Sequence, residues 1–495
     1  INSSLVNYSR ESLVCYTGAY MTKLTLLKQA ISQTSKAYCR LVLKEDSPNW
    51  HRLVETKDGQ LEYHLGAGKW KEIDARSFRT LVRTIVQAAK NHQIEELAIE
   101  LNREQFPKLA LYDESWFAST LVENILLADY EYTAYKTKES KTKTLKEVLI
   151  CGLTSKEAKA GFDRGLTLVT YINKARDIAN TPGCDMTPSD LATAAKKLMA
   201  GTKVTVKVLG EKELKQLKMG ALLAVGQGTK NETKFIIAEY WGAGKPAGNN
   251  DTMKQPVVLM GKGVTYDTGG LNVKPSGSMH DMHLDMSGGS AVLAAIAAAA
   301  KLGLKKNIVA LVPTAENAIS DSAMRAGDIV TSMSGQTIEI LHTDAEGRMI
   351  LADALTYSER YQPKAIIDVA TLTGAALVAL GQHASAILSK NEDLVTTLRT
   401  LSEEAGDLVW PLPLWDEYKQ HIRSTRADVA NIAPNFSKFG GSIEGGTFLS
   451  FFAPKKVPWA HIDIAPRMDS IPSDKLAKGA TGEPVRLLVK YLESV

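Results

Sequence analysis

The chain has 495 residues, of which 44% are hydrophobic and 23% charged, a balance typical of a soluble globular protein rather than a disordered or fibrous one. Because one hydrophobic core rarely organises so long a chain, we expect two domains. The formal net charge of +4 is small for this length, so it neither favours nor excludes a nucleic acid partner.

The cysteines and the apolar stretches bear on the compartment. The four cysteines form no C-x-x-C pair and are too few for a disulfide framework, which fits a reducing cytoplasm. The longest apolar stretches, such as AVLAAIAAAA, are too short to span a bilayer, so we expect no membrane segment. Residues 1–20 lack the apolar centre of a signal peptide. We expect them to be an extension outside the folded domains, either disordered or not native to the protein.

Residues 21–152 have the pattern of a small N-terminal α/β domain. The segment DARSFRTLVRTIVQAAKNH predicts a helix over 74–92, with Asp74 as its cap and apolar residues at helical spacing. ESWFASTLVENILLADYEYTAY predicts a second helix over 114–135. Three runs predict strands: KAYCRLVL at 36–43, LEYHLG at 61–66 and IEELAIEL at 94–101.

A lysine-rich run, KTKESKTKTLKEV, ends this region. It could bind phosphate groups, or it could be a solvated loop before a domain boundary. No aromatic residues interleave its lysines, which favours the loop. The segment TSKEAKAGFDRGLTLVTYINKARDIANT then predicts one long helix, and we assign residues 153–182 to a linker helix that ends at TPG.

Residues 183–495 alternate short apolar strands with helices, which predicts a larger α/β domain with a mixed, mostly parallel sheet covered by helices. Two helices are expected at 288–303 and 347–361. Four runs predict strands: VVLMGKGV at 257–264, NIVALVPTAEN at 307–317, AIIDVATLTG at 365–374 and WAHIDIA at 459–465. Ligands of such sheets collect at the carboxyl ends of the strands.

The predicted strand ends carry unusual polar residues. Lysine and acid rarely sit there unless they are paired or bound to metal. A phosphate site is not favoured, because Gly263 rather than Ser or Thr follows Lys262, and no G-x-G-x-x-G follows a strand. The residues concerned are Lys262, Asp267, Lys274, Asp285, Asp344, Glu346 and Arg348.

A metal centre explains these residues better than phosphate binding does. Carboxylates are hard oxygen ligands that can bridge two divalent ions, and two such ions would balance four clustered negative charges. One lysine could stay charged and stabilise an oxyanion, while the other could lose its proton beside a dication and ligate it. A structural salt-bridge network of the same residues remains an alternative on spacing alone.

The same segments resemble a known family. GKGVTYDTGG, KPSGSMHDMHLDMSGG, HTDAEGRMILADAL, ATLTGA, WAHIDIA and KGATGEPVRLL are similar, in order and spacing, to the leucine aminopeptidase (cytosol aminopeptidase) family of two-metal metallopeptidases. The resemblance runs from about residue 165 to the C-terminus. Residues 21–150 resemble the N-terminal domain of that family only in size and element order.

The resemblance implies the metal ligands. Asp267 and Glu346 would bridge two divalent ions, Mn²⁺ or Zn²⁺ with Mg²⁺ as a further option. Lys262 and Asp285 would complete the tighter site, and Asp344 would complete the more exchangeable one. The bridging hydroxide would attack the first peptide bond and release the N-terminal residue.

The resemblance also implies the catalytic and substrate-binding residues. Lys274 would polarise the scissile carbonyl, and Arg348 would hold a bicarbonate ion that acts as the base. Leu372 would offer its backbone N–H to that bicarbonate. An apolar pocket for Leu, Met and similar first residues would be formed by Met282, Thr371, Gly374, Ala465 and Met468.

Several positions depart from the family pattern. His342 replaces a common Asn, and we expect it to change a hydrogen bond near the metals rather than to remove a metal. His280 and His283 form an H-x-x-H pair that could look like half of a zinc site, but we expect polar residues at the pocket edge. Pro466 replaces a common Gly and would reshape the pocket for the first residue.

Further implications of the resemblance are a homohexamer, peptide substrates and a cytoplasmic location. Two alternatives stay open: a dipeptidase that prefers Cys-Gly, and an additional DNA-binding regulatory role. The lysines between 136 and 146 give the DNA-binding role its only local support, so a nucleic acid partner is not favoured.

Overall fold

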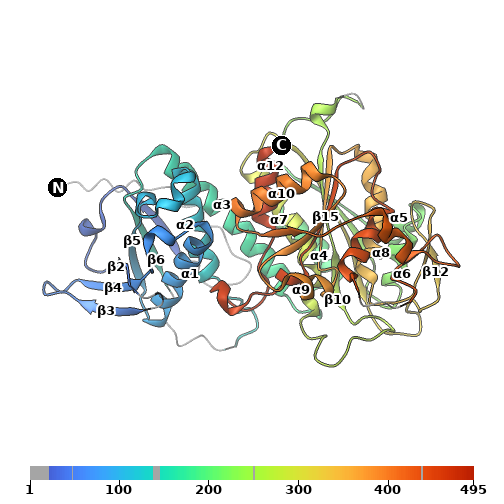
Figure 1. The fold of residues 1–495 in the computed structure, drawn as a ribbon, viewed down its shortest axis with the longest axis horizontal. Coiled ribbons are helices and arrows are strands. Elements are labelled where there is room, and N and C mark those ends of the chain that lie inside the picture. Colours follow the sequence, from blue (N-terminus) through green and yellow to red (C-terminus); the bar gives the residue numbers. More distant parts are fainter. Residues whose placement is uncertain (1–21, 47, 49, 138–144, 249–250, 436–438) are drawn as a thin grey trace.

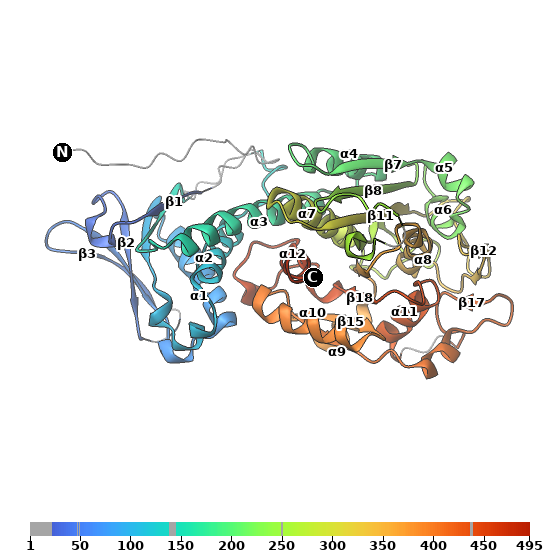
Figure 2. The same cartoon turned by 90° about the horizontal axis from the view of Figure 1, so that it is seen from above.

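The computed structural model describes residues 22–46, 48, 50–137, 145–248, 251–435 and 439–495. The predicted extension at 1–20 and part of the lysine-rich run lie outside these residues. Figures 1 and 2 show an N-terminal part and a larger C-terminal part, with one long helix, α3, running from the first into the second.

The N-terminal part is built on a six-stranded sheet. All neighbouring strands pair in parallel except β3 and β4, which pair antiparallel. In spatial order the strands are β1 (Lys23–Leu27), β6 (Glu147–Cys151), β5 (Glu96–Glu100), β2 (Cys39–Lys44), β4 (Leu61–Gly66) and β3 (His51–Glu55).

Two helices pack with this sheet, α1 (Ala75–Asn91) and α2 (Glu114–Asp129). Helix α1 begins as predicted, because the Asp74 side chain accepts a hydrogen bond from the Ser77 N–H at 2.9 Å. Helix α2 ends earlier than the predicted residue 135. There Tyr130 turns out of the helix and donates its hydroxyl hydrogen to Asp177 on α3 at 2.8 Å.

Helix α3 (Lys156–Asn180) fits closely against α2 because two glycines face that helix. A methyl group on Gly161 would lie 2.1 Å from the carbonyl oxygen of Ser115, and one on Gly165 would lie 2.7 Å from that of Ser119. Any larger residue at either position would push the two helices apart. The proposed domain boundaries at 152 and 182 bracket this helix, and they stay a prediction.

The C-terminal part is built on a nine-stranded mixed sheet, which confirms the predicted fold class. Three of its strand pairs are antiparallel (β7 with β8, β8 with β11, β15 with β18), and the other five are parallel. Its main path is β16 (Val409–Pro411), β15 (Ser385–Ser389), β18 (Trp459–Asp463), β14 (Ala365–Ala370), β9 (Val257–Gly261), β11 (Asn307–Asn317), β8 (Lys234–Trp241) and β7 (Thr205–Leu209), and β10 (Gly263–Asp267) pairs with β11.

Both faces of this sheet are buried, so alternate residues of a strand enter different cores. Val257 and Leu259 of β9 pack with one face, whereas Val258 and Met260 pack with the other. The first face is covered by α4 (Pro188–Leu198), α7 (Ser287–Lys301), α10 (Glu392–Ala405) and α12 (Val485–Ser494). The second is covered by α5 (Glu211–Gln216), α6 (Gly220–Gly226), α8 (Glu346–Ser358) and α11 (Gly441–Ser450).

Smaller elements complete the fold. Helix α9 (Gly374–Leu380) follows β14, and a three-stranded sheet joins β12 (Ile329–Thr331), β13 (Thr337–Glu339) and β17 (Val429–Ala430). In the described residues, the stretch Met282–Lys301 is long and apolar enough to cross a membrane, but 89% of its most apolar window is buried inside the protein. Burial of that kind marks α7 as a core helix.

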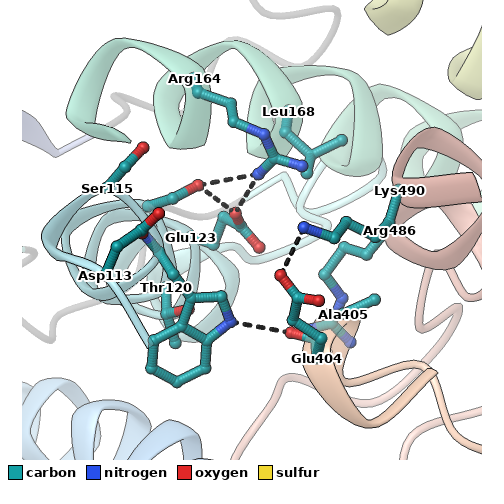
Figure 3. Close-up of a pocket in the computed structure, with 12 residues that line it drawn as sticks. Asp113, Ser115, Thr120, Glu123, Arg164, Leu168, Glu404, Ala405, Arg486 and Lys490 are labelled. Atoms are coloured by element: carbon teal, nitrogen blue, oxygen red, sulfur yellow. Dashed lines mark hydrogen bonds and ion pairs between the residues drawn. The ribbon is translucent and has the colours of Figure 1, made fainter. Parts of the chain in front are cut away.

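Side chains from both parts meet around a cavity of about 120 Å³ (Figure 3). Arg164 of α3 donates two hydrogen bonds to Glu493 of α12, at 2.9 and 3.0 Å, and one to Ser119 of α2 at 3.0 Å. Lys490 pairs with Glu404, whose carbonyl oxygen accepts from the Trp116 indole at 3.0 Å. These cations already have carboxylate partners. The side chains around the cavity are therefore best explained as a set of ion pairs and hydrogen bonds, here called the clamp, that holds the two parts together.

Candidate metal centre

Lys262 lies at a break between two strands. Its N–H donates to the Val369 carbonyl on β14 at 3.0 Å, and its own carbonyl accepts from Gly289 of α7 at 2.8 Å. Gly261 precedes it, where a methyl group would lie 2.4 Å from the Gly288 carbonyl oxygen. The predicted strand at 257–264 is therefore present but divided: the strand is interrupted at Lys262 and continues as β10.

Three carboxylates from separate elements converge beside this break. Asp267 ends β10, Asp344 lies in the loop before α8, and Glu346 is the first residue of that helix. One oxygen from each carboxylate lies within 4.8 Å of the other two. Asp267 and Glu346 are only 2% and 1% exposed, so their mutual repulsion is poorly screened by water. Such a cluster needs positive charge nearby.

Lys262 provides part of that charge. Its Nζ lies 2.8 Å from carboxylate oxygens of both Asp285 and Glu346, and it donates to the Thr371 carbonyl at 3.0 Å. Burial alone would lower the pKa of Lys262, but Asp285, Glu346 and Asp267 outweigh burial and raise the pKa above its ordinary value. In the absence of metal, Lys262 is therefore a charged ammonium.

Lys274 provides the rest. Its Nζ lies 2.7 Å from Asp267 Oδ2 and 2.5 Å from Asp344 Oδ1. Burial would lower the pKa of Lys274, but the carboxylates around it, Asp267 first, raise it above its ordinary value. Burial in turn raises the pKa of Asp344 to about 6 and that of Glu346 to about 7. Four carboxylates around two lysines leave an excess of negative charge.

Unpaired polar atoms indicate which ligands the site can bind. In the described part of the chain, Glu346 Oε2 is buried and has no hydrogen-bond partner, and the same holds for Arg348 Nε. Buried polar atoms without partners are rare in folded proteins. The carboxylate oxygens suit divalent metal ions, and the guanidinium of Arg348 suits a planar anion such as bicarbonate.

Three residues that sequence reasoning missed hold this arrangement in place. Asn317 donates from its side-chain amide to Asp267 Oδ1 at 2.8 Å. Asn431 accepts from the Leu341 N–H at 2.8 Å, and its carbonyl accepts from Arg348 Nη1 at 2.8 Å. Asp463 is the third, because its Oδ1 accepts from the Leu372 N–H at 3.0 Å. Asp463 lies in the family-like segment WAHIDIA, and Asn431 lies in RADVANI, a further segment that resembles the family. Asn317 is marked in the sequence only by its place at the end of a predicted strand.

The predicted substrate-binding residues lie on segments that surround the acids. Asp463 joins two of these segments, because its Oδ1 accepts from the N–H groups of Leu372 at 3.0 Å and Ala465 at 3.2 Å. The predicted donation from Leu372 to bicarbonate therefore has to share an N–H that already has an acceptor. Thr371 Oγ1 donates to Asp285 Oδ1 at 2.6 Å, which ties this segment to the centre.

The remaining predicted pocket residues flank these segments. Met282 is in the 3₁₀ turn that carries Asp285, and Gly374 is the first residue of α9. Ala465 begins the turn after β18, and Met468 packs against a small cluster of Ala179, Leu284 and Ala480.

His342 and His280 make polar contacts near the acid cluster. His342 Nδ1 accepts from the Asp344 N–H at 3.3 Å, so it supports the turn that carries a predicted ligand. His280 pairs with Asp281 at 3.0 Å and is largely exposed. Among described residues, the one group of His, Cys, Asp and Glu side chains with metal-binding geometry is Asp267, Asp344 and Glu346, so the H-x-x-H pair is not part of it. Pro466 is buried beside Ala465.

A cluster of carboxylates and lysines at the carboxyl ends of parallel strands, with donor atoms left for cations, defines the class: a metal-dependent hydrolase on an α/β scaffold. The chain belongs to the cytosol aminopeptidase family. Residues 173–489 match the catalytic domain of that family, and residues 63–139 match its N-terminal domain. Membership makes the chain a metal-dependent aminopeptidase that acts on peptides.

Relatives of known sequence or structure support this family membership. A probable cytosol aminopeptidase of Saccharophagus degradans is 41% identical over 468 residues, covering 92% of this chain and 91% of that protein. The structure is similar to a tomato leucine aminopeptidase mutant, with a TM-score of 0.83, 28% identity and coverage of 97% of each chain. It is also similar to the bottromycin maturation enzyme BotP in complex with Mn, with a TM-score of 0.80, 30% identity and coverage of 92% of this chain and 98% of that one.

Proposed function

We propose that this chain is a two-metal leucyl aminopeptidase that releases Leu, Met and other apolar residues from the N-termini of peptides. The observation that carries the proposal is the interleaving of Lys262 and Lys274 with the acid cluster at 2.5–2.8 Å. A salt-bridge network would need no more than this pairing. Here, however, a buried carboxylate oxygen of Glu346 and a buried N–H of Arg348 also stay without partners.

The acids and one lysine would hold the metal ions. Asp267 and Glu346 would bridge them, Lys262 and Asp285 would complete one site, and Asp344 would complete the other. When bound, two divalent ions would polarise the scissile carbonyl and lower the pKa of a water molecule. The similarity to a Mn complex supports Mn²⁺ as the first ion to try, followed by Zn²⁺ and Mg²⁺.

The chain's other residues would act on the substrate. Lys274 stays an ammonium among carboxylates, so it can stabilise negative charge that develops on the scissile carbonyl oxygen. Arg348 presents its buried guanidinium to bicarbonate, which would supply a proton acceptor. The first side chain of the peptide would lie against Met282, Gly374 and Met468, a mostly apolar surface that favours Leu and Met.

The test is release of free leucine from Leu-peptides by the full chain, loaded in turn with Mn²⁺, Zn²⁺ and Mg²⁺, in bicarbonate buffer. We expect Leu-Gly to be cleaved faster than Cys-Gly, and an N-acetylated peptide to resist cleavage because its amine is blocked. Faster cleavage of Cys-Gly would support the dipeptidase alternative instead. No leucine release with any of the three metals would contradict the proposal.

The family resemblance also supports a homohexamer and a cytoplasmic location, which we carry as part of the proposal. Sedimentation velocity of the metal-loaded protein tests the assembly, since a hexamer has six times the mass of the 53.8 kDa chain. A monomer or dimer at micromolar concentration would contradict it.

A further inference from the structure

Glu444 is a buried acid close to the centre that the proposed mechanism does not use. It lies in the first half of α11 and is 5% exposed. Its Oε1 has no hydrogen-bond partner among the described residues, and His421 Nδ1 lies 3.9 Å from it. A buried carboxylate with a free oxygen is costly unless a cation lies nearby.

Helix α11 brings Glu444 to the neighbourhood of Arg348. The next residue is Gly445, where a methyl group would lie 3.5 Å from Arg348 Nη2 and 3.0 Å from Leu372 Cδ2. The helix backbone therefore packs directly against the guanidinium and the segment that carries Leu372. A side chain at Gly445 would crowd Leu372, so glycine suits this close approach.

Arg348 in turn lacks a full set of partners. It is 6% exposed, Nη1 donates to the Asn431 carbonyl at 2.8 Å, and Nε has no partner among described residues. Burial raises the pKa of Glu444, and of the basic groups that oppose this effect Arg348 is the strongest, ahead of His421. Together with the approach of α11 to the guanidinium, this indicates that the charges of the two buried groups act on each other.

We infer that Glu444 is the built-in counter-charge of Arg348 and that it weakens the affinity of this site for an external anion. The inference rests on the proposed function, in which Arg348 holds bicarbonate. A carboxylate that already neutralises a buried guanidinium repels a second anion, because like charges interact strongly where water is excluded. Glu444 touches no reacting atom, so it is a specificity-determining residue rather than a catalytic one.

The direction of the effect follows from the charge. Replacing Glu444 with glutamine keeps the shape and removes the negative charge, so bicarbonate should bind more tightly. Coupling between two sites typically amounts to a factor of about 5 to 150, and we expect about a tenfold lower dissociation constant. Were Glu444 instead protonated and hydrogen-bonded to the anion, the same change would weaken binding.

The experiment measures anion binding without relying on activity. The metal-loaded full chain is titrated with ¹³C-bicarbonate and followed by NMR line broadening, for the wild type and for Glu444→Gln. Glu444→Ala serves as a second charge-removing variant in case glutamine disturbs the fold. Glu417→Gln is the matched control, because Glu417 is exposed on the neighbouring 3₁₀ helix and loses the same charge.

We expect tighter binding in both Glu444 variants, no change in Glu417→Gln, and loss of binding in Arg348→Ala. Unchanged or weaker binding in Glu444→Gln and Glu444→Ala would overturn the inference. So would bicarbonate binding that survives in Arg348→Ala, because the anion would then sit elsewhere. Leucine release is assayed in parallel: its absence would refute the proposed function, while the NMR titration still decides the role of Glu444.

Discussion

Gly347 offers a sharp test of how the metal centre is built, because it lies between two predicted functional residues and has no side chain of its own. A methyl group there would lie 2.6 Å from Lys262 Cε and 2.9 Å from its Cδ. Since carbon atoms in contact are normally about 3.5–4.0 Å apart, Lys262 would have to move by about 1 Å. It cannot do so freely, because its Nζ is held at 2.8 Å by both Asp285 and Glu346.

The expected cost of Gly347→Ala follows from these contacts. Overpacking a core costs about 1–3 kcal/mol, and breaking a buried ion pair costs about 3–5 kcal/mol. We therefore expect the variant to lose about 2–4 kcal/mol of stability and to bind metal about 10- to 100-fold more weakly. Metal affinity is measured by competition with a fluorescent chelator, and stability by denaturant unfolding.

The matched control is Gly248→Ala, since a methyl group at Gly248 meets nothing within 4 Å. It should leave metal affinity and activity unchanged. If Gly347→Ala binds metal within twofold of the wild type, Lys262 is not confined as described and the reasoning about the centre is wrong.

Three further predictions address the metal site, the pH dependence and the clamp. Asp344→Asn should weaken binding of the more exchangeable ion at least about tenfold, and an unchanged dissociation constant for that ion would contradict the ligand assignment. Burial raises the pKa of Asp353 from 3.8 to about 7, so the folded state takes up a proton that the unfolded state releases. As the pH rises from about 4 to 7, the wild type should therefore lose up to about 1.4 kcal/mol of stability per pH unit relative to Asp353→Asn. Parallel plots of stability against pH for the two proteins would refute this. Arg164→Met leaves Glu123 and Glu493 without their shared cation and should cost about 2 kcal/mol, read from Trp116 fluorescence during denaturation; an unchanged midpoint would show that the clamp is not stabilising.

Much of the fold could be predicted because local patterns determine it. The Asp74 cap and the apolar spacing after it place α1 within one residue of its observed start. The acids and lysines of the centre could be predicted to meet because residues at the carboxyl ends of parallel strands share one edge of the sheet. The family-like motifs then supplied roles that spacing alone left open.

Other features could not be predicted because they depend on contacts between distant residues. The break at Lys262 follows from hydrogen bonds to Val369 and Gly289, not from the apolar run in which it lies. Arg164 and Glu493 are 329 positions apart, so nothing in the local sequence marks them as partners. The sequence gives no sign that Glu444 is buried near Arg348, because that position depends on the packing of α11.

We propose that the acid and lysine cluster binds the metal ions on which peptide cleavage depends. The most direct measurement counts metal per chain by elemental mass spectrometry while leucine release is followed through chelation and reloading. We expect two divalent ions per chain in the active protein, loss of activity on chelation and recovery with Mn²⁺ or Zn²⁺. Full activity in protein that retains less than one ion per chain would contradict it.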